Sequence, residues 1–362
     1  MDGPAPHAPL DGTVEAEVCV IGLGAAGLAA AAHLASRGAD VVGIESGAIG
    51  GVATSRSAGL VRSGLAAFHH DAIEILGRRR AVALHWITLE EMDRLRTSGD
   101  DEFSWPGGLR IATSSLERED CARQYHVMQR DGLAVQHWSG PEGDGLLFPA
   151  DGVVNPVLRT RRLAREAAEA GARLFAFTQA QQVGERDVDT WTGEVRCRSV
   201  IVAIDGGLER VVPALAGIVH TRHVEMLATA PVREVRRSRP VIARWGHDIV
   251  RQLPDGRIVV GGRDDRGDDD TPWSLQPNST VQAELDTLLA ETFDRPLEVT
   301  HRWATATACT DDRLPVLARL GPSTIAVGAL NGHGTVLGPL LGRAAADLTL
   351  GRHSELADLL QA

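Results

Sequence analysis

One segment near the N-terminus constrains the fold of this chain more than any other. Val18–Ile21 is a continuous apolar run, which is typical of a strand buried on both faces. The glycine-rich turn Gly22–Gly27 follows it, and Leu28–Arg37 is rich in alanine and free of proline, which favours a helix ending at Gly38. Ala39–Glu45 is a second apolar strand. Together these pieces predict a strand–helix–strand unit.

The spacing of the glycines indicates what this unit binds. In a GxGxxG turn the first glycine, here Gly22, permits the tight turn, and Gly24 lets the backbone approach a pyrophosphate. Gly27 allows the helix to pack closely on the strand, and the helix N-terminus offers free N–H groups to phosphates. Glu45 stands where an acid accepts hydrogen bonds from ribose hydroxyls, which disfavours NADP. The segment predicts a dinucleotide site without distinguishing FAD from NAD.

Composition excludes several classes of partner. The formal net charge of −11 leaves no electrostatic footprint for nucleic acid or an anionic membrane surface. The four cysteines are widely separated and lack metal-ligand spacing. No apolar run reaches the roughly 18–20 residues that a membrane span needs, and the first residues lack the features of a signal peptide. We expect a cytoplasmic protein without a membrane span, nucleic-acid partner or bound metal.

Strands that run into glycine turns occur three times, at the beginning, near residue 200 and near the end. Between them lies more β-rich and charged sequence, including a charged loop at Asp264–Asp270. This pattern predicts an α/β fold in which one nucleotide-binding domain is assembled from separate segments and a second domain is inserted. Helices are expected at 71–97, 155–170, 281–292 and 335–349, a hairpin around 189–193, and inserted strands at 223–230, 241–245, 248–253 and 257–261.

Further motifs follow the first unit in a consistent order. They are Ser55–Arg62, Asp151–Pro156, Val200–Gly207, Trp303 with Asp311–Pro315, and Gly328 with Asn331–Gly334 and Gly338-Pro339. With these motifs the chain resembles, over nearly its whole length, the D-amino-acid oxidase superfamily of FAD-dependent oxidoreductases, which includes glycine oxidase and sarcosine oxidase. The resemblance implies a Rossmann-type FAD-binding domain with an inserted antiparallel-sheet substrate domain. We expect the FAD-binding domain to comprise 14–80, 150–220 and 301–362, and the substrate domain 81–149 and 221–300.

The resemblance also implies which residues hold FAD. Those expected along the pyrophosphate, adenosine, flavin ring and ribityl chain are Gly22, Gly24, Ala26, Gly27, Glu45, Ser46, Ser55, Arg56, Ser57, Ala58, Gly59, Leu60, Ala180, Ala203, Asp205, Asn331, Gly332, His333, Gly334 and Thr335. The helix after Gly334 would direct its positive end at the reduced flavin. His333 has a second interpretation, as a capping or packing histidine in a glycine turn.

Departures from the family pattern bear on the substrate. Amino-acid-oxidising relatives place an arginine between the tryptophan and the proline segment to clamp a carboxylate, and Thr307 occupies that position here, with Arg302 in a different register. An α-amino acid substrate would then need Arg62 or Arg263 as a substitute. The candidate pocket residues are Leu60, Arg62, Trp245, His247, Arg263, Thr307 and His333, of which Trp245 and His247 are also explained by packing.

Two further departures concern the flavin itself. Relatives that attach flavin covalently use a cysteine in this stretch, but Cys309 comes too late, so we expect noncovalent FAD. Sarcosine-oxidase relatives also have a lysine near the flavin that helps to activate oxygen, and the matching strand Arg257–Gly262 has none here, which makes oxygen a poorer acceptor. Oxygen and another electron acceptor therefore both stay open.

The expected reaction is oxidation of a C–N bond in an amine or amino-acid-like small molecule, by hydride transfer to flavin N5. No general base is assigned, because a neutral amine needs none. The alternatives are oxidation of a hydroxy acid or alcohol on the same scaffold, a non-catalytic flavin-binding protein, and an NAD-dependent dehydrogenase.

Overall fold

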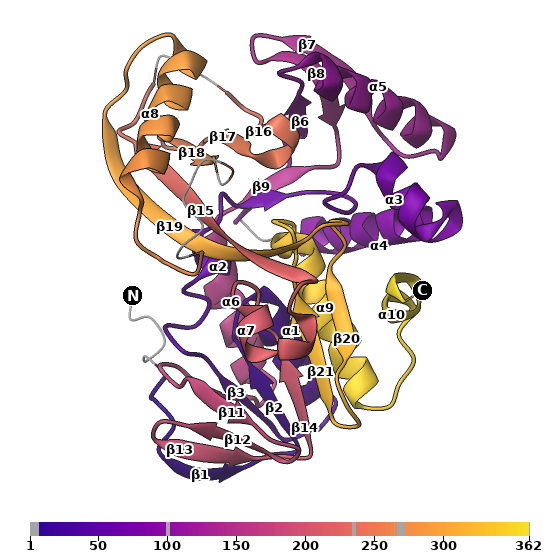
Figure 1. Cartoon of the computed structure of the whole chain (residues 1–362), viewed down its shortest axis with the longest axis vertical. Helices are drawn as coiled ribbons and strands as arrows, with labels where there is room; N and C mark the ends of the chain where they lie inside the picture. Colours follow the sequence, from indigo (N-terminus) through magenta and orange to yellow (C-terminus); the bar gives the residue numbers. More distant parts are fainter. Residues whose placement is uncertain (1–6, 99–101, 234–236, 264, 266–271, 362) are drawn as a thin grey trace. The chain divides into compact units, whose positions relative to one another are not determined.

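The computed structural model describes residues 7–98, 102–233, 237–263, 265 and 272–361 (Figure 1). The chain forms two compact units. Unit 1 comprises Met1–Ser55, Pro156–His220 and Ala308–Ala362, and unit 2 comprises Arg56–Asn155 and Thr221–Thr307. The first junction lies at Ser55, whereas the sequence had suggested one near residue 80. Of the expected charged loop Asp264–Asp270, all but Asp265 lies outside the described residues.

A six-stranded sheet forms the centre of unit 1. Its order is β10-β3-β2-β14-β21-β20, and every neighbouring pair is parallel except the edge pair β20–β21. All the residues of β2 and β3 are buried, as expected of apolar strands covered on both faces. The strand bounds are β2 Val18–Ile21, β3 Val41–Ile44, β10 Arg173–Phe175, β14 Ser199–Val202, β20 Val316–Arg319 and β21 Thr324–Gly328.

Three helices pack together beside this sheet. Helix α1 (Ala25–Ala35) contacts α6 (Pro156–Glu169) and α9 (Gly334–Thr349), and α1 and α9 also contact strands of the sheet. A Cβ atom on Gly342 would overlap the Ala26 carbonyl oxygen, and one on Gly338 would lie 3.1 Å from the Ala25 Cβ. Glycine at these positions therefore lets α9 approach α1 closely.

A small sheet and short helices complete unit 1. The sheet has the order β1-β13-β12-β11, and β12 and β13 form the hairpin expected around residues 189–193. The bounds are β1 Gly12–Glu15, β11 Ala180–Val183, β12 Asp187–Thr190, β13 Gly193–Arg196, α2 Ala53–Arg56, α7 Leu208–Val211, η1 Pro213–Leu215 and α10 Glu355–Leu360.

Unit 2 is built on a larger, mainly antiparallel sheet. Its order is β19-β15-β18-β17-β16-β6-β8-β7. From β15 to β7 the neighbouring strands are antiparallel, except for the parallel pair β16–β6. The bounds are β6 Gly108–Ile111, β7 Gln136–Gly140, β8 Gly143–Phe148, β15 Val219–Thr229, β16 Val241–Ala243, η2 Arg244–Gly246, β17 Asp248–Gln252, β18 Ile258–Gly262, α8 Ser279–Phe293 and β19 Val299–Thr310.

A three-stranded sheet, ordered β4-β9-β5, is also part of unit 2. Both of its strand pairs are antiparallel, and Val154 donates a backbone hydrogen bond to the Gly59 carbonyl at 2.8 Å. The bounds are β4 Leu60–Val61, β5 Phe103–Ser104 and β9 Gly152–Val154. This pairing fixes the chain that leaves the Ser55–Gly59 segment.

Two expectations for helices in unit 2 are corrected. The stretch 71–97 forms two helices, α3 (His69–Leu76) and α4 (Arg78–Thr97), because Gly77 adopts φ +78° between them. A further helix, α5 (Ser115–Arg130), is absent from the expected helices. Ser114 caps α5 by accepting from the Glu117 N–H, and the Glu117 carboxylate accepts from the Thr113 N–H. No helix in the described part of the chain is long and apolar enough to cross a membrane.

Candidate functional site

The glycine turn of unit 1 is closed so tightly that side chains are excluded from it. Gly22 has φ +90°, and a Cβ there would lie 2.6 Å from the Ala203 carbonyl oxygen. A Cβ on Gly27 would overlap the Gly22 carbonyl oxygen. Gly24 is the N-cap of α1 and has no side chain to cap the helix, while the N–H of Ala25 donates to Thr54 Oγ1 at 3.1 Å. The turn is a cradle of the kind that the pyrophosphate of a dinucleotide requires.

Glu45 lies directly after β3 and turns its carboxylate back toward the same glycine turn. Its Oε2 accepts from the Leu23 N–H at 2.9 Å, and its Oε1 accepts from the Ser46 hydroxyl at 3.0 Å and the Gly47 N–H at 3.3 Å. The carboxylate is therefore oriented before any ligand arrives. The Thr178 N–H donates to the Glu45 carbonyl at 2.7 Å, which brings the chain entering β11 at Ala180 next to Glu45.

Asp205 follows β14, the strand that neighbours β2 on its other side. Its Oδ1 accepts from the Leu330 N–H at 3.0 Å and its Oδ2 from the Ala308 N–H at 3.1 Å. Enclosure of this carboxyl raises its pKa to about 6, against the opposing effect of the two hydrogen bonds. Asp205 thus joins the ends of β14, β19 and β21.

The turn between β21 and α9 is the third element at this edge. Asn331 has φ +51°, its Oδ1 accepts from the Thr310 N–H at 3.0 Å, and its Nδ2 donates to the Ala329 carbonyl at 2.6 Å and the Leu314 carbonyl at 3.1 Å. Gly332 has φ +75°, and the buried His333 is the N-cap residue of α9. Gly334 and Thr335 begin the helix, so its positive end lies at this turn.

The parallel pairing places these features along one edge of the sheet. Strands β3, β2, β14 and β21 are successive neighbours, and their carboxyl ends lead to Glu45, the glycine turn, Ala203 with Asp205, and the Asn331 turn. In open parallel sheets ligands bind at the carboxyl ends of the strands. Unit 1 therefore offers a cradle, an oriented acid and two helix N-termini, which together fit the dinucleotide part of FAD.

The segment that follows leads from unit 1 into unit 2. The Ser55 hydroxyl donates to Thr160 Oγ1 at 3.1 Å within unit 1. Within unit 2, Arg56 Nη1 donates to the Ala304 carbonyl at 3.0 Å, and the Arg56 carbonyl accepts from Trp303 Nε1 at 2.8 Å. The Ser57 hydroxyl accepts from the Gly59 N–H at 3.2 Å, Gly59 has φ +69°, and the chain then enters β4 at Leu60. The residues Arg56–Leu60 thus form a turn that hydrogen bonds within unit 2 hold in place.

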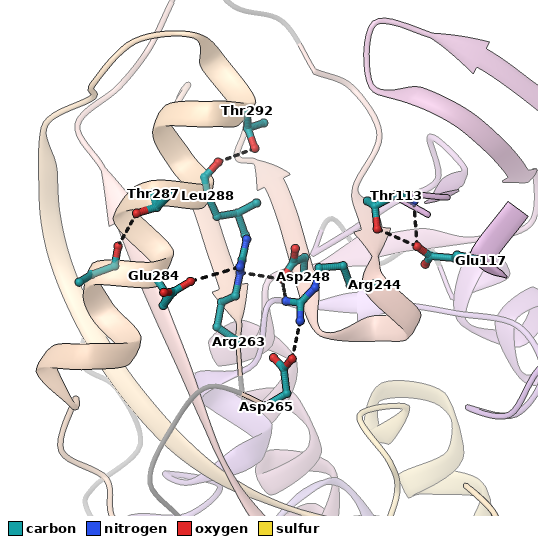
Figure 2. Close-up of polar contacts among 11 residues, drawn as sticks. Thr113, Glu117, Arg244, Asp248, Arg263, Asp265, Glu284, Thr287, Leu288 and Thr292 are labelled. Atoms are coloured by element: carbon teal, nitrogen blue, oxygen red, sulfur yellow. Dashed lines mark hydrogen bonds and ion pairs between the residues drawn. The ribbon is translucent and has the colours of Figure 1, made fainter. Parts of the chain in front are cut away.

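Arg263 is held by two acids of unit 2. Its Nε lies 3.0 Å from Asp248 Oδ1, and its Nη1 donates to Glu284 Oε2 at 3.3 Å (Figure 2). Asp248 also accepts from Arg244 Nη1 at 3.0 Å, and Arg244 binds Asp265. Burial raises the pKa of Asp248 against the opposing effect of the two arginines. The Arg263 guanidinium is therefore already engaged by carboxylates of the chain itself.

Trp245 and His247 lie at the turn between β16 and β17. Trp245 has φ +54°, its N–H donates to Glu117 Oε1 at 2.9 Å, and its Nε1 donates to Asp120 Oδ2 at 2.8 Å. The His247 carbonyl accepts from the Arg263 N–H at 2.7 Å. The hairpin thus brings Trp245, His247 and Arg263 into one region of unit 2.

The other pocket candidates are distributed over both units. Leu60 is buried in β4, Arg62 directly follows that strand, and Thr307 is half-buried near the end of β19, all in unit 2, while His333 belongs to unit 1. Thr54 is a further residue of this region that the sequence does not predict. Its Oγ1 accepts a hydrogen bond from the Ala25 N–H at 3.1 Å, at the start of α1. A threonine in a Gly/Ser/Ala-rich stretch carries no pattern that singles it out.

Comparisons with known proteins agree with this geometry. The chain matches the family model DAO, FAD dependent oxidoreductase, over residues 17–348. It is 27% identical over 386 residues to the probable oxidoreductase OrdL of Rhizobium meliloti (strain 1021), covering 97% of this chain and 87% of that protein. It is 26% identical over 384 residues to gamma-glutamylputrescine oxidoreductase of Escherichia coli (strain K12), covering 96% and 86%.

Solved structures show the same fold. Glycine oxidase from Geobacillus kaustophilus superposes with a TM-score of 0.76 at 22% identity, covering 96% of this chain and 98% of that one. L-proline dehydrogenase from P. horikoshii gives a TM-score of 0.76 at 21% identity, with 96% of each chain covered. The expected Rossmann-type α/β fold with an inserted antiparallel sheet is confirmed. The chain belongs to the DAO family of FAD-dependent oxidoreductases, and FAD is its cofactor.

Proposed function

We propose that this protein oxidises a C–N bond of an amine or amino-acid-like small molecule, using FAD held without a covalent link. The observation that carries the proposal is the likeness to relatives over nearly the whole chain. Those relatives bear the names of nitrogen compounds: gamma-glutamylputrescine oxidoreductase and the glycine oxidase of Geobacillus kaustophilus. The human dimethylglycine dehydrogenase is similar over 67% of this chain and 30% of its own length. When bound, FAD supplies the acceptor for a hydride from the substrate carbon.

Within unit 1, the proposal assigns the cofactor contacts by position. The N–H groups at the start of α1 bind the pyrophosphate, Glu45 and Ser46 bind the adenosine ribose, and the chain at Ala180 borders the adenine. The turn Asn331–Thr335 holds the ribityl chain, and the positive end of α9 favours negative charge on the reduced flavin. Ala203 and Asp205 complete the edge between them.

Within unit 2, the turn of Arg56–Leu60 passes along the flavin, and the substrate side chains come from the hairpin region of Trp245, His247 and Arg263, with Arg62 and Thr307. The pairing of Arg263 supports the proposed substrate class. Arg263 is bound by Asp248 and Glu284, so a substrate carboxylate would have to compete with two carboxylates for it. An amine or a larger amide-containing substrate fits this arrangement better than a simple α-amino acid, and a neutral amine needs no general base.

The first test is an absorption spectrum of the purified protein before and after acid precipitation. We expect flavin absorption that moves to the supernatant, as noncovalent FAD requires. The holoenzyme is then offered substrates anaerobically: polyamines and their acylated forms, N-methylated glycines, glycine and proline, with lactate and glycerol phosphate for the alternative chemistry. Bleaching by an amine supports the proposal. If only the hydroxy compounds bleach the flavin, the protein oxidises a hydroxy acid or alcohol instead. If none of the offered compounds bleaches the flavin, a non-catalytic role is favoured.

A further inference from the structure

A buried arginine in unit 2 joins the large sheet to the turn before β4. Arg251 lies on β17 opposite Val259 of β18, and its side chain is 6% exposed. Its Nη1 lies 2.7 Å from the Ala58 carbonyl oxygen, 3.1 Å from that of Gly59 and 2.8 Å from that of Val154. One guanidinium nitrogen thus gathers three backbone carbonyls from two distant segments.

No acid compensates this charge in the described part of unit 2. Burial alone lowers the pKa of Arg251 to about 10, and the buried Nε has no hydrogen-bond acceptor. The neighbouring Arg263, by contrast, is paired with Asp248 and Glu284. A buried charge is costly unless it is paired, and a neutral amide side chain would satisfy carbonyl oxygens at lower cost. The presence of a positively charged side chain at this buried position therefore needs an explanation.

The carbonyls that Arg251 binds belong to the turn which, on the proposed function, passes along the flavin. Because trans peptides hold C=O and N–H on opposite sides, the peptides after Ala58 and Gly59 direct their positive ends away from the guanidinium. Val259, which lies opposite Arg251, belongs to an apolar cluster with Met226, Ala228, Ala58, Leu253 and Trp303. In such surroundings a charge is weakly screened and acts over a longer range than in water.

We infer that Arg251 is a positioning and electrostatic residue for the flavin. Its hydrogen bonds to the Ala58 and Gly59 carbonyls hold the turn Arg56–Leu60 in place. Its uncompensated positive charge stabilises the negative charge that the cofactor gains on two-electron reduction. The inference rests on the proposed function for the placement of this turn. It assigns no contact between Arg251 and substrate, and no proton to be moved.

The test compares two variants that differ in charge but not in their ability to donate hydrogen bonds. Arg251→Lys keeps a cation, and Arg251→Gln does not. The flavin midpoint potential is measured anaerobically against a reference dye, with FAD in excess so that all forms are loaded. We expect the two-electron reduction constant of R251Q to fall by about tenfold, which corresponds to about 30 mV, and that of R251K to stay close to wild type.

A matched control comes from the same unit. Arg237 donates Nη2 to the Thr292 carbonyl at 3.2 Å and stacks over Phe293 at 4.9 Å, but does not contact the turn. Arg237→Gln removes an arginine charge and a bond to a carbonyl, and we expect it to leave the potential unchanged. An equal fall in R237Q and R251Q would overturn the inference, as would an unchanged potential in loaded R251Q. An equal fall in R251K and R251Q would show that geometry acts rather than charge.

A second pair of variants decides the matter if R251Q does not fold. Val259→Glu places a carboxylate opposite Arg251 and leaves the arginine itself unchanged, and Val259→Gln is its neutral match. We expect a lower potential in V259E than in V259Q, and equal potentials would overturn the inference. If wild-type protein binds no FAD, the proposed function fails instead, which separates the two failures.

Discussion

At the scale of single residues, Gly27 tests the cradle directly. A Cβ there overlaps the Gly22 carbonyl oxygen, so Gly27→Ala must push α1 away from the turn. We expect FAD affinity to fall by about tenfold or more, since a loss of ~1.4 kcal/mol gives that factor. Titration of apoprotein with FAD by fluorescence quenching measures it. Gly321→Ala is the control, because nothing lies within 4 Å of its Cβ; equal affinities for the two variants would contradict the cradle.

The buried carboxyl of Asp151 leads to a prediction about how the free energy of unfolding depends on pH. It is buried, its Oδ1 accepts from the Ser63 N–H at 2.9 Å and the Ser63 hydroxyl at 2.8 Å, and burial raises its pKa to about 6. A carboxyl with a raised pKa binds more protons in the folded state than in the unfolded state. Its stabilising contribution is therefore complete below its unfolded pKa of about 4 and is lost as the pH rises through 6.

Asp151→Asn mimics the protonated carboxyl and removes this dependence. Relative to D151N, we expect the unfolding free energy of wild type to decrease by roughly 3 kcal/mol between pH 4 and pH 7.5. Urea unfolding at several pH values measures the difference. Asp311→Asn, at an exposed carboxylate, is the control variant. A wild-type minus D151N difference that is flat with pH would argue against a raised pKa.

Sequence patterns found some site residues and missed others for a physical reason. Glu45 was found because an acid at the end of the second strand stands at a fixed spacing from the glycine turn. Thr54 and Arg251 act on segments far away in the chain, through bonds to Ala25 and to the Ala58 carbonyl. Such contacts depend on tertiary packing and cannot be predicted from the local sequence pattern.

At the scale of elements, the packing of α9 on α1 makes a graded prediction. A Cβ on Gly342 overlaps the Ala26 carbonyl oxygen, whereas one on Gly338 meets the Ala25 Cβ at 3.1 Å, a contact that a small shift relieves. We expect Gly342→Ala to destabilise the protein by about 1–3 kcal/mol and Gly338→Ala by less. Thermal unfolding of the FAD-loaded variants measures both. The reverse order of stability would mean that the helices separate more easily than their packing indicates.

Helices and strands were predictable where one periodicity ran unbroken. The buried strands β2 and β14 and the helices α6, α8 and α9 lie close to their expected ranges. The apolar spacing predicts one helix over 71–97 because it continues across Gly77, whose φ of +78° the pattern does not encode. Helix α5 does not stand out in the sequence, although Ser114 caps it and the Glu117 carboxylate accepts from the Thr113 N–H, because its residues are mostly polar.

At the scale of the whole molecule, the chain passes between its two units four times, after Ser55, Asn155, His220 and Thr307. Strand-into-glycine signals predicted that unit 1 is discontinuous, since each of its segments contains part of the parallel sheet. The first junction could not be located from sequence, because the residues after it are held by long-range contacts such as that of Arg56 with Ala304.

The four cysteines give a test that involves the entire fold. Cys19, Cys121 and Cys197 are buried and Cys309 is half-buried, and none of these four described residues forms a disulfide. Burial raises the pKa of Cys121 to about 11, which further suppresses its reactive thiolate. We expect a thiol reagent at neutral pH to modify no more than Cys309 in the native protein, and all four cysteines once the chain is denatured.

The same titration bears on how the flavin is held. If FAD is noncovalent, denatured holoprotein yields four thiols and all flavin stays in the supernatant after acid precipitation. If Cys309 carried the flavin, the denatured count would be three, with flavin in the pellet. Cys309→Ser separates these cases: it should lower the denatured count by one and leave the flavin content unchanged. Loss of flavin in that variant, together with a denatured wild-type count of three, would contradict noncovalent binding and place the attachment at the end of β19.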